Sequence, residues 1–263
     1  MDGVSEAPVV SVIILTWNHS HLLKDFLRSF EANVGPEWLA RTELIIVDNG
    51  STDDTDAVLR QWEAATIGAR FKQTLRHPVN VGFAAGNNSA IRRARGEYFL
   101  LLNNDVVLKS NLVKACQEAC GSGTRTLLGA RLISQPTPWN QINGGFVRYL
   151  EGWCLFGSAS TFREIAMRGE GGPEQVFDET FSPAFFEDMD LSLRAHIQGI
   201  SLRQARLPVR HLEGRTSKRT ESFPFMEIIR ENQRRFQKKW GHLRPEDLEW
   251  PSPLPWPRAG KII

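Results

Sequence analysis

The sequence predicts an α/β fold with a mostly parallel sheet that is covered by helices on both faces. Apolar strands and amphipathic helices alternate through the first half of the 263 residues, in the order typical of β-α-β units. The strands at 44–47 and 98–102 are continuous apolar runs, as expected for strands that are buried on both faces. Polar residues follow these runs at the carboxyl ends, where open α/β sheets bind their ligands.

The first half contains five expected strands and four expected helices. The strands are predicted at 9–15, 44–47, 71–76, 98–102 and 125–133, and the helices at 21–30, 54–65, 83–94 and 111–120. The first helix carries Leu22, Leu23, Phe26, Leu27 and Phe30 on one face, which is the spacing of an amphipathic helix. The acidic residues that begin helix 54–65 suit the positive end of a helix dipole.

The second half is less regular after a proline-rich turn at 135–139. Strands are predicted at 143–150 and 153–161, as a hairpin around Glu151 and Gly152. A flexible loop at 168–173, a helix at 188–198 that ends at Gly199, a strand at 201–206 and the segment 207–211 follow, and then a helix at 224–240. The proline-rich stretch 245–257 is expected to be extended and partly disordered, or docked on a surface.

Composition disfavours several classes of protein. The net charge of +2 gives no argument for nucleic acid as a partner. No apolar run approaches the about 20 residues that a membrane span requires, and no signal peptide is expected from the first residues. Three cysteines without a CxxC spacing indicate reduced thiols and a cytosolic compartment. Cys116 and Cys120 lie one helical turn apart, but burial is favoured over a shared metal.

The ends of the first three strands leave two interpretations open. The first strand ends in Thr16-Trp17-Asn18-His19; neither GxGxxG nor GxxxxGK[ST] occurs, which disfavours NAD enzymes and P-loop NTPases. Asp48 and Asn49 could form a capped turn or could bind the edge of a nucleobase. The small residues around Gly82 would allow either close helix packing or a phosphate at a helix N-terminus.

The fourth strand ends in Asn103-Asn104-Asp105. Their oxygen atoms suit magnesium or manganese, and the alternative is an ordinary turn with polar caps.

Taken together, these segments resemble the family 2 glycosyltransferases of the GT-A fold. The matching segments are 11–18, 45–53, 80–88, 101–105, 186–194 and 209–214, within residues 9–240. The resemblance is closest to the branch that includes rhamnosyltransferase-like enzymes of bacterial cell-surface polysaccharide assembly. It implies a GT-A fold, with a Rossmann-like, mostly parallel sheet and a smaller mixed β/α region on the acceptor side.

The resemblance implies a nucleotide-diphospho-sugar donor with a uracil or thymine base. The residues implied for its binding are Thr16, Asn18, Asp48, Asn49, Ser51, Asn80, Gly82, Asn87, Asn103, Asn104, Arg215 and Lys218. Arg215 and Lys218 fall in a loop that, in relatives, closes over the diphosphate. The resemblance also implies a divalent cation, Mn or Mg, with Asp105 and His211 as ligands. Because Asp105 is the only formal charge in its motif, we expect metal and donor to bind together.

The resemblance implies that Asp188 is the catalytic base of an inverting transfer. Its neighbour Glu187 would orient the acceptor or nearby loops, although an acidic helix start alone explains both residues. Asp190 suits the helix dipole and is interpreted as structural, with acceptor contact as the alternative. Trp153 is interpreted as core, with sugar stacking as the alternative.

The expected organisation is one domain over 1–240, with a nucleotide-binding half at 8–134, an acceptor-binding half at 135–240 and a tail at 241–263. The acceptor would be a saccharide, a lipid-linked glycan or a protein. The basic residues of helix 224–240 are interpreted as a solvated face, with contact to an anionic membrane or to a lipid-diphosphate acceptor as the alternative. A peripheral location at the inner face of the membrane stays open. Dimerisation and docking to another protein both stay open for the tail. A sugar nucleotidyltransferase and a non-catalytic nucleotide-sugar-binding module are the alternative functions.

Overall fold

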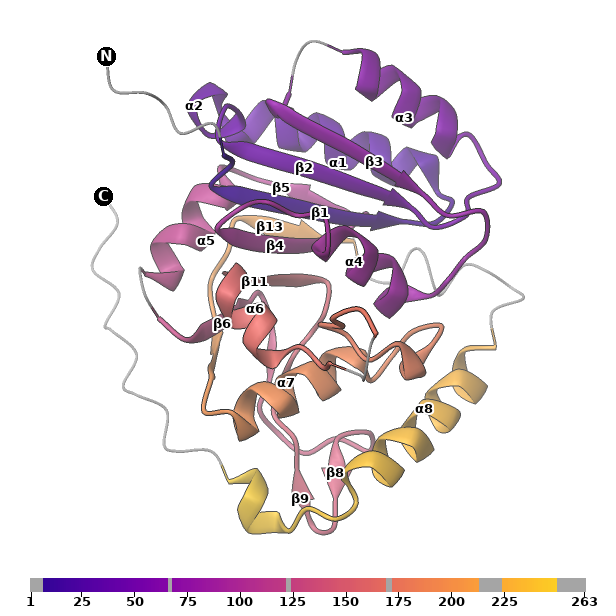
Figure 1. Cartoon of the computed structure of the whole chain (residues 1–263), viewed down its shortest axis with the longest axis vertical. Helices are drawn as coiled ribbons and strands as arrows, with labels where there is room; N and C mark the ends of the chain where they lie inside the picture. Colours follow the sequence, from indigo (N-terminus) through magenta and orange to yellow (C-terminus); the bar gives the residue numbers. More distant parts are fainter. Residues whose placement is uncertain (1–6, 66–67, 122–123, 169–171, 213–223, 250–263) are drawn as a thin grey trace.

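The computed structural model describes residues 7–65, 68–121, 124–168, 172–212 and 224–249. Its main sheet has seven strands in the order β12-β6-β11-β4-β1-β2-β3 (Figure 1). The strands are β1 (Val10–Thr16), β2 (Thr42–Asp48), β3 (Phe71–Arg76), β4 (Tyr98–Asn103), β6 (Thr126–Gly129), β11 (Cys154–Ser158) and β12 (Ser201–Gln204). Only β11 runs antiparallel to its neighbours, β4 and β6, so the predicted mostly parallel α/β sheet is confirmed.

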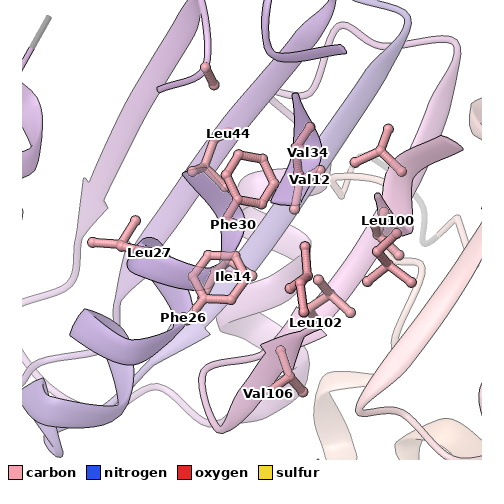
Figure 2. Close-up of a cluster of buried hydrophobic side chains, with 14 of the residues drawn as sticks. Val12, Ile14, Phe26, Leu27, Phe30, Val34, Leu44, Leu100, Leu102 and Val106 are labelled. Atoms are coloured by element: carbon pink, nitrogen blue, oxygen red, sulfur yellow. The ribbon is translucent and has the colours of Figure 1, made fainter. Parts of the chain in front are cut away.

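Helices cover both faces of this sheet (Figure 1). They are α1 (Ser20–Val34), α2 (Pro36–Leu39), α3 (Thr55–Ala64), α4 (Phe83–Ile91), α5 (Leu112–Cys120), α6 (Ala159–Ile165), α7 (Glu187–Ile197) and α8 (Phe225–Trp240). Alternation along β1 sends Val12 and Ile14 into the core under α1, whereas Ile13 enters the core on the other face. Figure 2 shows Phe26 and Phe30 of α1 against these strands; burying each ring contributes about 1.5–3 kcal/mol.

The expected strand 125–133 is confirmed only as far as Gly129 (β6), because the chain leaves the main sheet there. Gly129 lies against Leu150, where a Cβ would stand only 2.9 Å from the leucine side chain. The chain then forms β7 (Leu132–Ile133), which pairs with β10 (Tyr149–Leu150) in a separate ribbon.

The expected hairpin around Glu151 and Gly152 is also wrong. These residues join β10 to β11, which belong to different sheets. Instead of one strand at 143–150, β8 (Gln141–Ile142) pairs with β9 (Gly145–Phe146). Residues 159–161 begin α6, because the Ser158 side chain accepts a hydrogen bond from the Thr161 amide and caps the helix.

A short ribbon places the second half of the chain against the end of β4. β5 (Val106–Leu108) pairs antiparallel with β13 (Val209–His211), and His211 stands opposite Val106. His211 therefore lies next to Asp105, from which it is separated by more than 100 residues in sequence.

A third apolar cluster lies in the second half of the chain. It joins Phe181, Phe186 and Met189 to Phe236 of α8 and to Leu248. Leu248 belongs to the 3-10 helix η2 (Pro245–Leu248) and is 5% exposed. Up to residue 249, the tail is therefore docked, as one of the two sequence-based alternatives expected.

The described residues also bear on the expectations about membrane spans and cysteines. Among them, no helix combines the length and apolar character required to cross a bilayer. The cysteines are free and buried, as expected.

Candidate active site

A cleft of about 430 Å³ opens at the carboxyl ends of the parallel strands. It is bounded on the opposite side by residues 183–189 and by Ile229 of α8. Nine residues expected from the sequence line this cleft together: Asn49, Asn80, Asn103, Asn104, Asp105, Trp153, Glu187, Asp188 and His211.

Asn49 holds the loops after β2 and β3 together. Its Nδ2 donates to Asn80 Oδ1 at 3.0 Å, and its Oδ1 accepts from the Val81 amide at 3.0 Å. Asn80 Oδ1 also accepts from the Gly82 amide at 2.9 Å. Gly82 has a φ of 90°, and a Cβ there would stand 2.8 Å from Ser182 Oγ. The glycine therefore permits both the backbone conformation and the close approach of loop 182–183.

The other expected residues lie outside the lining of the cleft, and most of them shape its loops. This set is Thr16, Asn18, Asp48, Ser51, Gly82, Asn87 and Asp190. Thr16 Oγ1 accepts from Asn104 Nδ2 at 2.9 Å, and Asp48 Oδ1 accepts from the Ser51 amide at 2.9 Å.

Two further residues of this set make local contacts. Asn18 Oδ1 accepts from the Thr52 amide at 2.8 Å, and Asn87 is buried with its Nδ2 donating to Phe83 O. Arg215 and Lys218 lie outside the described residues.

Asp105 and His211 form the pair expected to hold a metal. Asp105 Oδ1 lies 3.1 Å from His211 Nε2, and Asp105 is 3% exposed. Trp153 stacks flat on His211, with ring centroids 4.5 Å apart and an interplanar angle of 5°. The Trp153 indole donates to Glu151 Oε2 at 3.0 Å. Glu151 and Trp153 thus fix the orientation of the imidazole.

The Asp105–His211 pair fits part of a divalent-cation site. Two neighbouring ligands of an octahedral ion, each at about 2.1 Å, stand about 3 Å apart, close to the separation of the two atoms. Among the described residues, no group of three or more His, Cys, Asp or Glu residues could hold a metal ion. Further ligands would therefore have to come from elsewhere, such as a bound diphosphate and water.

Asp188 presents its carboxylate to the cleft from the first turn of α7. Its Oδ2 accepts from the Gly152 amide at 3.0 Å, and its Oδ1 accepts from the Met189 amide at 2.8 Å. A Cβ on Gly152 would stand 3.3 Å from Asp188 Cβ, so glycine permits this contact. Burial raises the pKa of Asp188 to about 6, although both amides oppose the shift. A carboxylate with that pKa is suited to accept a proton near neutral pH.

Glu187 is buried beside Asp188. It is 6% exposed, and its Oε2 has no hydrogen-bond partner among the described residues. Burial and the neighbouring charge of Asp188 raise the pKa of Glu187 well above its ordinary value.

The turn before Asp188 has an unfavourable backbone that α8 stabilises. Phe185 and Phe186 have φ values of 76° and 77°, and such conformations cost about 1–3 kcal/mol each outside glycine. Asn232 of α8 donates to the carbonyl oxygens of Phe181, Ala184 and Phe185 at 3.1, 2.9 and 3.2 Å. The buried amide of Asn232 therefore holds the segment that precedes Glu187 and Asp188.

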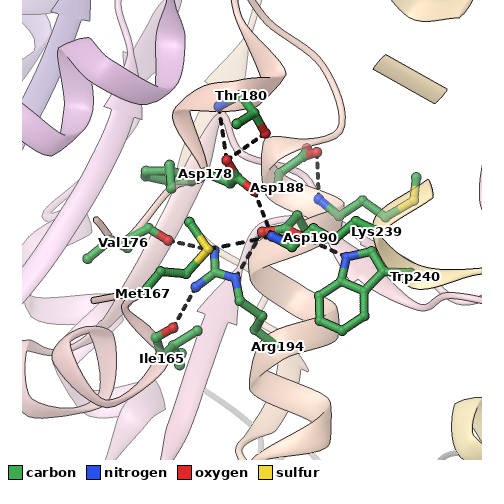
Figure 3. A network of polar contacts seen from close by, with 12 residues as sticks. Ile165, Met167, Val176, Asp178, Thr180, Asp188, Asp190, Arg194, Lys239 and Trp240 are labelled. Atoms are coloured by element: carbon green, nitrogen blue, oxygen red, sulfur yellow. Dashed lines mark hydrogen bonds and ion pairs between the residues drawn. The ribbon is translucent and has the colours of Figure 1, made fainter. Parts of the chain in front are cut away.

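Asp190 lies in a buried polar network that joins α7 to α8 (Figure 3). Its carboxylate accepts from Arg194 Nε at 2.8 Å and from Trp240 Nε1 at 2.8 Å, and it pairs with Lys239 Nζ at 2.6 Å. Arg194 also donates to the carbonyl oxygens of Ile165 and Val176. Asp190 thus anchors the helix that carries Asp188.

The network also corrects the expectation of a solvated basic face on α8. Lys239 is paired with both Asp178 and Asp190 at 2.6 Å, so that expectation is wrong for this residue. Arg234 is 75% exposed and fits it.

Several cleft residues were not expected from the sequence. They include Trp17, Trp139, Tyr149, Glu151, Phe185 and Ile229. Trp17 lies between Thr16 and Asn18, so its position after a strand was a usable signal. The others meet the cleft only through long-range packing, for which the sequence offers no local signal.

The family of this chain follows from its similarity to known proteins. The model of the family described as "Glycosyl transferase family 2" matches residues 11–172. The chain belongs to glycosyl transferase family 2. This family 2 chain is 36% identical over 98 residues to the putative teichuronic acid biosynthesis glycosyltransferase TuaG of Bacillus subtilis, covering 37% of the chain and 36% of that protein.

A second curated relative comes from Campylobacter jejuni. It is named GalNAc(5)-diNAcBac-PP-undecaprenol beta-1,3-glucosyltransferase and is 26% identical over 128 residues, which cover 49% of this chain and 40% of that enzyme. The matched regions therefore cover less than half of either relative.

Solved structures show that this family 2 member has the GT-A fold that the sequence predicts. The mannosyltransferase PcManGT of Pyrobaculum calidifontis, in complex with GDP-Man and Mn2+, is 19% identical with a TM-score of 0.55, over 76% of this chain and 55% of that chain. GalNAc-T7 with UDP, GalNAc and Mn2+ is 14% identical with a TM-score of 0.57, over 79% and 44%.

Proposed function

We propose that this family 2 member is an inverting glycosyltransferase that moves a sugar from a UDP- or dTDP-sugar to an acceptor hydroxyl. The observation that carries the proposal is the presence, in one cleft, of Asp188 with a raised pKa and of the Asp105–His211 pair. A base on one side and a diphosphate-binding pair on the other are the two requirements of such a transfer.

In the proposed reaction, the acceptor oxygen forms a bond to the anomeric carbon while the bond from that carbon to the diphosphate oxygen breaks. Asp188 Oδ2 or Oδ1 takes the acceptor proton. The amides of Gly152 and Met189 hold the carboxylate in place. A single base on the face opposite the leaving group gives inversion. Glu187, with its unpartnered oxygen, positions the acceptor.

Asp105 and His211 would hold a divalent cation, Mn or Mg, through Oδ1 and Nε2. When bound, that ion supplies Lewis-acid stabilisation of the departing diphosphate. The stacked Trp153 and the carboxylate of Glu151 keep the imidazole in one orientation. Manganese in two structural neighbours and the sugar-transfer names of the curated relatives support this assignment.

The test is release of nucleoside diphosphate from a panel of UDP-, dTDP- and GDP-sugars with and without Mn2+, including the dTDP-rhamnose type. Asp188→Asn should lower turnover by about 10²–10⁴-fold and leave the thermal stabilisation by donor unchanged. Asp25→Asn, on the exposed face of α1, is the matched control and should keep full activity. Normal turnover by Asp188→Asn would refute the base assignment.

A further inference from the structure

The cleft changes character between its two ends. The strand ends contribute amides and Asp105, whereas the part formed with Asp188 is mostly apolar. There, Tyr149, Phe185 and Ile229 line the cleft beside Trp139, Pro183 and Ala184. The acceptor has to bring a hydroxyl to Asp188, so this apolar part surrounds the acceptor.

The term stacking wall is used here for Trp139, Tyr149, Phe185 and Ile229. These side chains are partly buried and pack against the third apolar cluster. Phe185 also meets the Phe225 ring edge-on at 4.9 Å. Each ring is therefore already ordered and keeps open surface toward the cleft, which reduces the entropy lost on binding. Ordered flat rings suit the C–H faces of a sugar ring, which are flat and apolar as well.

Carboxyl groups are the main ionisable groups of the cleft. Four line it, those of Asp105, Glu151, Glu187 and Asp188, and among the described lining residues there is no lysine or arginine. Arg131 reaches Glu151 at 3.4 Å, but it is 59% exposed and does not line the cleft. A donor diphosphate would neutralise the Asp105 end together with its cation. A negative acceptor at the Asp188 end would meet the carboxylates of Asp188 and Glu151 and, among the described lining residues, no lysine or arginine.

We infer that the cleft beside Asp188 is a subsite for an uncharged sugar residue, held against Trp139 and Tyr149, and that it excludes sugars that carry a carboxylate or phosphate. This inference rests on the proposed function, because Asp188 as base defines which end of the cleft receives the acceptor. The stacking wall provides affinity and the carboxylates provide discrimination.

The experiment compares matched pairs of small acceptor analogues on the full chain with UDP and Mg2+. The pairs are methyl β-glucopyranoside with methyl β-glucopyranosiduronate, and the corresponding galactose pair, so that only the carboxylate differs within a pair. Saturation-transfer NMR titrations give the dissociation constants. We expect the neutral member of at least one pair to bind at least about fivefold more tightly than its acid, because like charges oppose the acid.

Three variants test the two parts of the inference. Trp139→Ala and Tyr149→Ala should each weaken binding of the neutral glycoside by about threefold to tenfold, and UDP affinity should stay unchanged. Trp38→Ala, a partly buried tryptophan outside the cleft, is the matched control and should keep glycoside affinity. Glu151→Gln retains an acceptor for the Trp153 indole but removes one charge, so it should narrow the difference between the two members of a pair.

Equal or tighter binding of the acids would overturn the inference, as would wall variants that bind like the unmodified chain. The inference would also be overturned if octanol bound in the same titrations and neither glycoside did, since the stacking wall would then be a site for a hydrocarbon chain. Thermal unfolding of each variant separates these outcomes from loss of fold. Donor turnover is measured separately, so an active enzyme that prefers acidic acceptors refutes this inference and leaves the proposed function standing.

Discussion

The two parts of the cleft, the proposed donor side and the proposed acceptor side, are held in place by different means. On the donor side, Asn49, Asn80 and Asp48 follow strands of one parallel sheet and bond to loops close by. On the acceptor side, Asp188 follows two residues with left-handed backbone and depends on Asn232, which lies more than 40 residues further along the chain. The donor side thus derives its geometry from the sheet, and the acceptor side derives it from α8.

Substitutions on the two sides should therefore have different effects on ligand binding and on stability. Loss of a sheet-derived contact should affect donor binding locally. Loss of an α8 contact should affect the base, the acceptor wall and the stability of the chain together, because Ile229, Asn232 and Lys239 all belong to that helix.

The largest expected effect is that of Asp190→Asn. The substitution removes the carboxylate partner of the buried Arg194, while Lys239 keeps its pair with Asp178, and breaking a buried pair costs about 3–5 kcal/mol. Urea unfolding should show a loss of that order. Asp48→Asn on the donor side should cost less than about 1 kcal/mol, because the amide oxygen still accepts from Ser51. Equal losses of unfolding free energy in the two variants would contradict the proposed difference between the two sides.

Asn232→Leu should have the next largest effect. The variant keeps the side-chain volume but leaves three carbonyl oxygens without their donor, at about 1–3 kcal/mol. We expect kcat to fall because the segment before Asp188 relaxes, while the dissociation constant for UDP does not change. Arg234→Leu, at an exposed position of the same helix, is the control. A parallel loss of UDP affinity would show that α8 supports both sides.

The pH profile tests the acceptor side alone. Because the base must be ionised and the pKa of Asp188 is raised to about 6, kcat/KM should fall about tenfold per pH unit below that value. UDP affinity over the same interval is the internal comparison and should vary much less. A flat activity profile from pH 7 to 5 would be inconsistent with Asp188 as base.

The same shift has a consequence for stability. The folded pKa of Asp188 lies above the ordinary value of 3.8, so the folded state favours the protonated carboxyl. That favourable contribution is complete below about pH 4 and is lost as the pH rises through about 6. Asp188→Asn should therefore be more stable than the unmodified chain above pH 6, with no gain below pH 4, as thermal unfolding at the two pH values would measure.

The smallest effect is expected from Trp153→Phe. Phenylalanine can still stack on His211 but cannot donate to Glu151, so the imidazole is held less firmly. The Mn2+ concentration that gives half-maximal activation should rise about threefold. Trp62→Phe removes an indole N–H that has no hydrogen-bond partner among the described residues and should leave metal activation unchanged.

Local patterns located the strand-end part of the cleft for a physical reason. A buried parallel strand reads as an apolar run, and its carboxyl end is a fixed place in the fold, so Asn49, Asn103 and Asp105 could be located from local patterns. The resemblance to a family then added Asp188 and His211, which local patterns do not bring together.

The acceptor side was predicted less well because its contacts are long-range. Alternation at 143–161 gave no information on which strands pair, so the insertion of β11 between β4 and β6 was missed. Tyr149 and Asn232 are ordinary residues of a strand and a helix, and only packing shows what they touch. Asp190 was interpreted through the helix dipole, whereas its partners lie on its own helix at Arg194 and on α8.

The position of β11 has a consequence for how the chain is made. β11 pairs with both β4 and β6, so β4 and β6 cannot be joined in one sheet until residue 158 has been synthesised. Until then, Leu100, Leu101 and Leu102 form an open apolar edge, which is a template for pairing with other chains. A chain that ends near residue 134 would therefore leave this edge of β4 unpaired, and we expect it to aggregate more readily than the full chain.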